Sequence, residues 1–258
     1  MRSVFNVFIP LVLATGCGGS AEQEESRPWI TLFNGADLTG WIPKFSDHPL
    51  GENYKNTFRV QDSVIRVSYA EYDTFRNEFG HLFYDTPFKY YRLQLEYRFV
   101  GDPTPGAPAW AIRNNGVMIV AQSPQSMLLD QDFPLSVEVQ FLGGDGSHER
   151  PTGNLCTPGL HVHINDTLRT EHCISSNSKT YHGEQWVPIE VVVMPDSTIH
   201  HIVAGDTVMS YARPVVGGDH LPDGYPFKEG TPVIEGYIAL QAESHNTEFR
   251  NIRLQEID

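Results

Sequence analysis

Hydrophobic and polar residues alternate along several segments of the chain, as in β-strands with one buried face. The clearest case is PLSVEVQFL, residues 134–142, with Leu135, Val137, Val139 and Phe141 on one side and Ser136, Glu138, Gln140 and Leu142 on the other. An acid and an amide therefore stand on the non-core face of an interior strand. Because a carboxylate in mid-sheet costs free energy unless it is paired or solvated, Glu138 is either a partnered structural acid or part of a substrate cleft.

Other segments also have strand patterns, and Gly, Asn and Asp residues separate them. Hairpins are predicted for residues 58–60 with 64–68 and for residues 198–203 with 207–212, and further strands for residues 30–33, 91–100, 160–165, 187–194, 236–242 and 249–257. One more strand is predicted to carry Trp110 and Ile112, whereas residues 44–56, 101–108 and 143–158 are predicted to be loops. Short strands without helical periodicity predict a single all-β domain, a sandwich or barrel.

The N-terminus has the pattern of an export signal. Met1 and Arg2 precede an apolar run, residues 4–14, that is too short to span a bilayer. The sequence LATGC at residues 13–17 resembles a bacterial lipobox, which predicts a lipoprotein signal peptide over 1–16 and lipidation of Cys17. Plain secretion is the alternative. Residues 17–28 are predicted to be a flexible tether, and residues 29–258 the folded domain.

Composition restricts the partners. The 18 basic and 32 acidic residues give a formal net charge of -14, which argues against nucleic acid or an anionic membrane surface as a partner. We therefore expect membrane contact only through the N-terminal lipid. The expected location is the periplasm or the outer membrane, or the cell surface.

Three cysteines are present. If Cys17 carries lipid, Cys156 and Cys173 remain, and in an oxidising compartment they predict a disulfide that is worth about 3 kcal/mol in the loop-entropy model. A zinc site is the rival interpretation because histidines lie near both cysteines in the sequence. These are His161, His163 and His172, although their spacing matches no common zinc ribbon or finger.

Five stretches of sequence, in their order and spacing, resemble a known family. They are residues 32–41 (LFNGADLTGW), 113–117 (RNNGV), 137–140 (VEVQ), 236–241 (GYIALQ) and 248–252 (EFRNI). The resemblance is to the 3-keto-disaccharide hydrolases, also described as 3-keto-glucoside 1,2-lyases and hydratases, and it covers residues 29–258. It implies a concanavalin-A-like jelly-roll β-sandwich with a concave sheet that binds sugar. Here Asn115 replaces the usual Ser, and residues 143–183 are longer than in simple members.

A 3-keto sugar can be cleaved with one general base. The ketone at C3 acidifies the hydrogen on C2, so its removal forms an enolate and expels the group on C1; water can then add to the product. Such a site needs a base, a group that stabilises the enolate oxygen and an acid for the leaving group. We assign Glu138 as the base, Arg113 to the enolate and His163 as an acid or base. The substrate-binding candidates are Trp110, Asn114, Asn115, Gln140, His161, Arg98 and Gln241.

Several alternatives remain at this point. Glu138, His161 and His163 could hold a divalent metal, although no cofactor is established. Ordinary glycoside hydrolysis needs two carboxylates, and the candidates for the second are Glu96, Glu190 and Glu243. The domain could also be a carbohydrate-binding module without catalysis. The structural alternatives are an Arg113–Glu138 ion pair, sheet histidines held by hydrogen bonds, a turn at residues 114–116 and a core position for Trp110.

Overall fold

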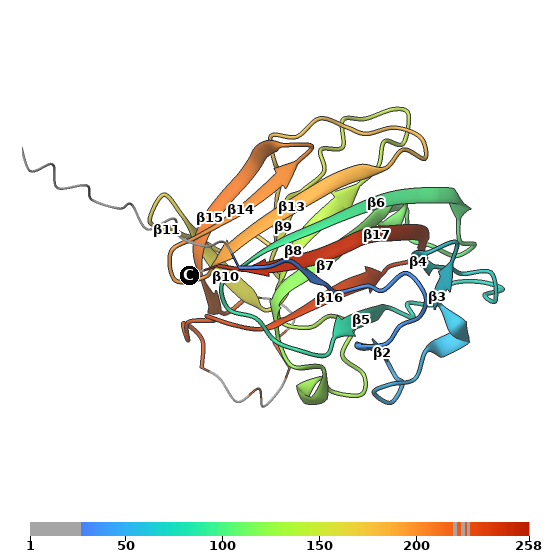
Figure 1. Ribbon diagram of the computed structural model, residues 1–258, viewed down its shortest axis with the longest axis horizontal. Coiled ribbons are helices and arrows are strands. Elements are labelled where there is room, and N and C mark those ends of the chain that lie inside the picture. Colours follow the sequence, from blue (N-terminus) through green and yellow to red (C-terminus); the bar gives the residue numbers. More distant parts are fainter. Residues whose placement is uncertain (1–26, 219–220, 223–224, 226–227, 258) are drawn as a thin grey trace, which may run out of the picture.

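The computed structural model describes residues 27–218, 221–222, 225 and 228–257. The predicted signal peptide, Cys17 and most of the predicted tether lie outside these residues. Within them the chain forms two antiparallel sheets that pack face to face (Figure 1). The described helical segments are the short 3-10 helices Tyr54–Asn56, Ala109–Ala111 and Pro124–Ser126. In this part of the chain no helix has the length and apolar character needed to cross a bilayer.

The larger sheet has ten strands in the described residues. The order is β11 (Thr167–Arg169), β10 (Leu160–Ile164), β15 (Asp206–Val216), β14 (Thr198–Val203), β13 (Val187–Met194), β6 (Tyr91–Pro103), β17 (His245–Glu256), β4 (Val64–Val67) and β3 (Phe58–Gln61), with β1 (Ile30–Thr31) paired to β17. The predicted hairpins are confirmed as β3–β4 and β14–β15.

The smaller sheet has seven strands in the same part of the chain. Its order is β12 (Cys173–Ile174), β9 (Asn154–Cys156), β8 (Val137–Leu142), β7 (Asn114–Ala121), β16 (Tyr237–Ala242), β5 (Gly80–Tyr84) and β2 (Trp41–Phe45). The strand with the clearest alternation, β8, therefore lies in the interior of this sheet, as predicted.

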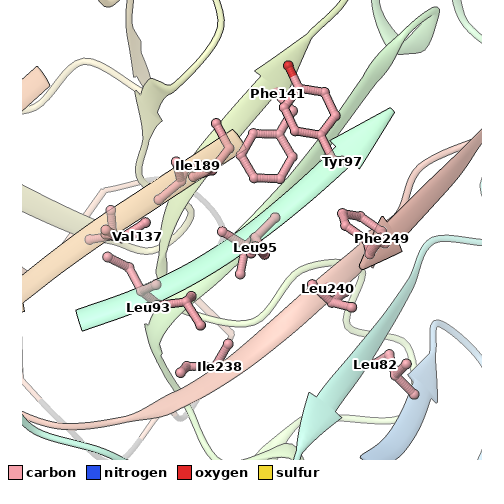
Figure 2. Close-up of a cluster of buried hydrophobic side chains, with 14 of the residues drawn as sticks. Leu82, Leu93, Leu95, Tyr97, Val137, Phe141, Ile189, Ile238, Leu240 and Phe249 are labelled. Carbon is pink, nitrogen blue, oxygen red and sulfur yellow. The ribbon is translucent and has the colours of Figure 1, made fainter. Parts of the chain in front are cut away.

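The hydrophobic core fills the space between the two sheets (Figure 2). Val137, Val139 and Phe141 of β8 are completely buried there. The ring of Phe141 stacks on Tyr97 of β6 with centroids 4.2 Å apart. The alternation in residues 135–142 is thus confirmed: its apolar side faces the core, which turns Glu138 and Gln140 to the outer face of the sheet. The fold is an all-β jelly-roll sandwich.

Some predicted boundaries are wrong. Trp110 lies in a 3-10 helix rather than a strand, and Arg113, directly before the strand, has a positive φ of 48°. The strand begins only at Asn114, so the alternative of a turn at residues 114–116 is also wrong. The predicted loops at residues 44–56 and 143–158 contain the end of β2 and all of β9. Neither strand alternates between buried and exposed residues: β2 contains a proline, and β9 has only three residues, all of them buried.

Candidate active site

A cavity of about 550 Å³ lies on the outer face of the seven-stranded sheet, over its middle strands. Its polar floor comes from Glu138 and Gln140 of β8, Asn114 of β7 and Glu243, which follows β16. The disulfide side chains of Cys156 and Cys173, together with Trp110, also contribute to its walls. Two carboxyl groups, one on β8 and one directly after β16, therefore face one opening.

Gly116 explains how these two carboxyl groups approach one another. Gly116 of β7 is in register with Gln140, which is the next residue after Glu138 on the outer face of β8. A Cβ atom placed on Gly116 would lie 2.5 Å from Oε1 of Glu138, closer than real Cβ contacts. The side chain of Glu138 therefore lies across the empty position above β7 and extends toward β16. Only a residue without a side chain leaves this path open.

The strand on the other side of β7 provides the second carboxyl group. Leu240 of β16 pairs with Val117, which brings the next residue, Gln241, beside Gly116. The Nε2 atom of Gln241 donates a 3.3 Å hydrogen bond to Oε1 of Glu243. Glu138 and Glu243 are only 6% and 4% exposed. Four buried oxygens gather here without a hydrogen-bond partner in the described structure: Asn114 Oδ1, Glu138 Oε1, Gln241 Oε1 and Glu243 Oε2.

Burial changes the protonation of both acids. Burial raises the pKa of Glu138 to about 8. It also raises the pKa of Glu243 well above its ordinary value, and the nearby Glu138 carboxylate adds to this rise. No ion pair joins either acid to a cation of the described residues. Because two such carboxyl groups resist simultaneous ionisation, Glu243 keeps its proton when Glu138 ionises, so the pair becomes both a proton donor and a proton acceptor as the pH rises through the pKa of Glu138.

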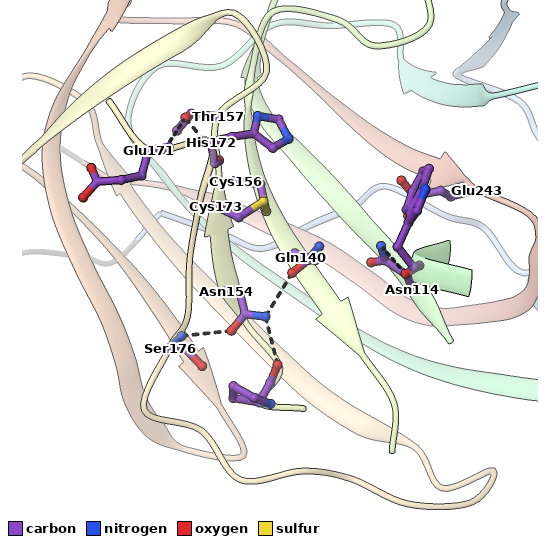
Figure 3. Close-up of a disulfide and its surroundings, with 12 residues drawn as sticks. Asn114, Gln140, Asn154, Cys156, Thr157, Glu171, His172, Cys173, Ser176 and Glu243 are labelled. Atoms are coloured by element: carbon purple, nitrogen blue, oxygen red, sulfur yellow. Dashed lines mark hydrogen bonds between the residues drawn. A yellow bond between two sulfur atoms is a disulfide. The ribbon is translucent and has the colours of Figure 1, made fainter. Parts of the chain in front are cut away.

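Gln140 is oriented by a chain of hydrogen bonds next to the disulfide (Figure 3). The backbone N–H of Ser176 donates to Oδ1 of Asn154 over 2.9 Å, which fixes the Asn154 amide. Nδ2 of Asn154 then donates to Oε1 of Gln140 over 3.0 Å. With its oxygen accepting this bond, the Gln140 amide group is set as a hydrogen-bond donor toward the cavity.

The rim of the cavity carries an aromatic face and a cation. Trp110 is 53% exposed and stacks on Phe79, with ring centroids 6.0 Å apart. An exposed indole at a polar cavity suits stacking on the apolar face of a sugar ring. Arg150 also lines the cavity, and its Nη1 donates a 2.8 Å hydrogen bond to the carbonyl of Gly143.

The structure separates the predicted histidines from Glu138. His161 and His163 lie on β10 of the ten-stranded sheet, where Nδ1 of His163 lies 3.1 Å from the carbonyl of Arg213. The prediction that they share an opening with Glu138 is therefore wrong, because strand parity gives the face of a strand but not its sheet. The metal set of Glu138, His161 and His163 is likewise divided between two sheets. Among the described residues no group of three or more His, Cys, Asp or Glu side chains could hold a metal ion.

Three other candidates also lie elsewhere. The Arg113 guanidinium donates to the carbonyl of Gly183 and does not pair with Glu138. Asn115 is completely buried on the core side of β7, where Nδ2 donates to the carbonyl of Gln241 over 2.9 Å. Arg98 lies on the ten-stranded sheet and forms a 2.6 Å ion pair with Glu248. The structure thus brings five of the predicted residues together: Glu138, Gln140, Asn114, Trp110 and Gln241. Arg113, Asn115 and Arg98 are not part of this group.

Glu243 and Arg150 are the main additions. Of the three acids considered as a second carboxylate, Glu96 and Glu190 lie on the ten-stranded sheet and pair with Arg250 and Arg92. Glu243 alone of the three lines the cavity. The sequence indicated it because Gln241 and Glu243 alternate with Leu240, which places both on the polar face. Arg150 comes from a loop, and no pattern in the sequence indicated it.

The disulfide prediction is confirmed. Cys156 and Cys173 are bonded to each other, which rules out the alternative of a zinc site with these thiolates as ligands. Cys156 is in register with Glu138, so the disulfide lies directly beside the acid.

Comparison with known proteins identifies the family. The model of the 3-keto-alpha-glucoside-1,2-lyase-like domain matches residues 28–255. The chain therefore belongs to this family of carbohydrate-active domains, which confirms the resemblance. No curated protein matches the sequence.

Two solved structures of other proteins have the same fold. Two structures of candidate glycosyl hydrolases from Parabacteroides distasonis ATCC 8503 are similar, both with a TM-score of 0.53. The first is 15% identical and covers 89% of this chain and 94% of its own; the second is 16% identical and covers 89% and 100%. A beta-glucanase from Bacillus licheniformis has a TM-score of 0.46 at 13% identity, over 92% of this chain and 100% of its own.

Proposed function

We propose that this protein cleaves 3-keto-glucosides or 3-keto-disaccharides by removing the C2 proton and eliminating the group on C1. The observation that carries the proposal is the pair of buried carboxyl groups, Glu138 and Glu243, which line one cavity and form no ion pair among the described residues. Such a pair can accept a proton at one position and donate one at another. Membership of the keto-glucoside lyase-like family supports the choice of substrate.

Glu138 is the base in this mechanism. Its carboxylate takes the hydrogen from C2, and the electron pair of that bond becomes the enolate of the C3 ketone. The enolate then re-forms the ketone as the C1–O bond breaks, and Glu243 protonates the departing oxygen. The products are an unsaturated keto sugar and an alcohol; addition of water gives net hydrolysis. A proton must afterwards return from Glu138 to Glu243, which their proximity favours.

Neighbouring groups stabilise the enolate and hold the sugar. The Gln140 amide is set as a donor by Asn154, and the Arg150 guanidinium adds positive charge to the cavity wall. They replace Arg113 in the role that the sequence assigned to it. Donors that are fixed before reaction stabilise developing negative charge most strongly. The exposed Trp110 indole provides a stacking surface for the ring.

The test is to compare a 3-keto-α-glucoside with the same glucoside before oxidation. We expect release of the alcohol from the keto form alone. Replacing either acid by its amide is expected to reduce kcat by about a hundredfold or more, the usual contribution of a positioned acid or base. Equal activity of the Glu138→Gln variant would overturn the assignment.

The pair of carboxyl groups also favours a second function, two-carboxylate hydrolysis of ordinary glycosides. Cleavage of the unoxidised glucoside would support this alternative. Binding of both sugars without turnover would support the third candidate, a carbohydrate-binding module.

We also propose that the protein is exported and anchored through a lipid on Cys17. The Cys156–Cys173 disulfide supports export, since disulfides persist mainly in oxidising compartments. In cells, the Cys17→Ser variant is expected to move from the membrane fraction to the soluble fraction and to lose labelling by a fatty acid. A variant that remains in the membrane would contradict the lipid anchor.

A further inference from the structure

His81 of β5 is buried, but no neighbouring group forms a hydrogen bond with its ring in the described structure. Its side chain is completely inaccessible to solvent, and neither ring nitrogen has a hydrogen-bond partner in the described structure. A neutral imidazole has one donor and one acceptor, and leaving both unused costs free energy. Because buried polar groups are rarely left without partners, such a group points to a role in binding or catalysis.

The position of His81 connects it to the cavity. It lies on the outer face of the seven-stranded sheet, in register with Gln241 of β16 and Lys44 of β2. Gln241 is the residue that bonds to Glu243, and its Oε1 also lacks a partner in the described structure. The row of polar positions therefore continues from Gln140, past Gly116 and Gln241, to His81.

Phe133 covers this continuation. Its ring contacts the His81 ring edge to face, with centroids 5.9 Å apart, and it also lines the cavity. Phe133 belongs to the segment between the 3-10 helix Pro124–Ser126 and β8. This segment is attached to β2 by a 2.9 Å hydrogen bond from Nζ of Lys44 to the carbonyl of Leu129. The Phe133 ring, which also packs on Phe79 with centroids 5.0 Å apart, thus stands between a polar cavity and a polar surface with unused hydrogen-bonding groups.

We propose that Phe133 is a gate, and that His81 and Gln241 form a second saccharide subsite that opens when its ring turns aside. Resting on the proposed function, this places the second ring of a two-ring glycoside over His81 when the ring that reacts lies over Glu138. A neutral imidazole suits a sugar hydroxyl, which is itself both donor and acceptor. Burial, with a contribution from Lys44, lowers the pKa of His81 to about 3 and keeps it neutral.

The first test compares kcat/KM for a 3-keto-disaccharide and for methyl 3-keto-α-glucoside, which has one ring. In the His81→Leu variant we expect kcat/KM for the disaccharide to fall roughly tenfold more than for the methyl glycoside, mainly through KM, because one polar contact to the second ring is lost. The control is His201→Leu. His201 is equally buried but lies 2.8 Å from the Tyr211 hydroxyl, so its loss should lower the melting temperature without changing the substrate ratio.

An equal loss on both substrates in the His81→Leu variant would overturn the subsite. Absence of turnover by the wild type on both substrates would instead overturn the proposed function. A binding measurement does not depend on the folding of a His81 variant. In the Glu138→Gln protein, we expect the imidazole nitrogen signals of His81 to shift on addition of the keto-disaccharide and not on addition of the methyl glycoside. Signals that stay unchanged with the disaccharide bound would contradict the proposal.

Discussion

Buried acidic residues on the outer faces of the two sheets differ in whether they form ion pairs. On the ten-stranded sheet, Glu248 is as buried as Glu138, but it lies 2.6 Å from Arg98 and 3.4 Å from Arg66. On the seven-stranded sheet, Glu138 and Glu243 have each other and no cation among the described residues. Because both arrangements occur in one protein, the absence of an ion pair at Glu138 and Glu243 is specific to the cavity on the seven-stranded sheet. The charge of the paired acid is compensated by arginines, whereas burial raises the pKa values of the unpaired acids, as the proposed chemistry requires.

The largest expected effect separates activity from stability at these two positions. Glu138→Gln should lower kcat on a 3-keto-glucoside by about a hundredfold or more, because the base is lost. Its melting temperature should stay equal or rise, because an unpaired buried carboxyl group is replaced by a neutral amide.

The matched control is Glu248→Gln on the other sheet. It should keep the wild-type kcat and lose roughly 1–3 kcal/mol of unfolding free energy, because two arginines lose a buried partner. Activity assays and thermal melts on both variants test the comparison. A pair of variants that lose activity and stability in parallel would show that the two sheets do not differ.

Replacing Glu243 should produce an effect that depends on the leaving group. For Glu243→Gln we expect a loss in kcat of about a hundredfold on a keto-disaccharide, whose leaving group needs protonation. The loss should be much smaller on a 3-keto p-nitrophenyl glucoside, whose phenolate leaves without an acid. The check is kcat for both substrates. An identical loss on both would remove Glu243 from the role of acid.

A steric change gives a smaller expected effect. In Gly116→Ala, the new Cβ would lie 2.5 Å from Oε1 of Glu138, so the carboxyl group must move. We expect roughly a tenfold loss of kcat. The strain should also lower the free energy of unfolding by about 1–3 kcal/mol. Gly217→Ala is the control, because its Cβ would meet His161 at 2.6 Å, on the other sheet. Loss of activity in the control alone would indicate that the histidine region is the site.

The pH dependence of stability should be the mildest effect. Burial raises the pKa of Glu138 from 4.5 to about 8 in the folded protein. Between these values the folded state holds a proton that the unfolded state releases, so the free energy of unfolding falls as pH rises. The free energy of unfolding, measured with denaturant at several pH values, should fall less steeply with pH in Glu138→Gln than in the wild type. An unchanged slope would mean that Glu138 is ionised throughout.

Strand parity predicted the most useful part of the site. The alternation around Glu138 gave both its orientation and that of Gln140, because side chains alternate with a period of two. The same rule could not place His161 and His163, since it does not say which strands become neighbours. The pairing of β7 with β16 joins residues far apart in the chain and depends on the whole fold.

The remaining parts of the site depend on features without a periodic signal. Gly116 is one of 22 glycines, and only the position of the Glu138 side chain explains why it is needed. Arg150 and Trp110 come from a loop and a single helical turn. The unpartnered state of His81 likewise depends on the packing of Phe133, which no local pattern contains.

The most direct test of the central claim follows the hydrogen on C2. A 3-keto-α-glucoside carrying deuterium at C2 is treated with the wild-type protein and with Glu138→Gln, and the alcohol and sugar products are analysed by mass spectrometry against a sample without enzyme. The account predicts that the wild type releases the deuterium to water in step with release of the alcohol, and that the variant does neither. Release of the alcohol with the deuterium kept at C2 would contradict it.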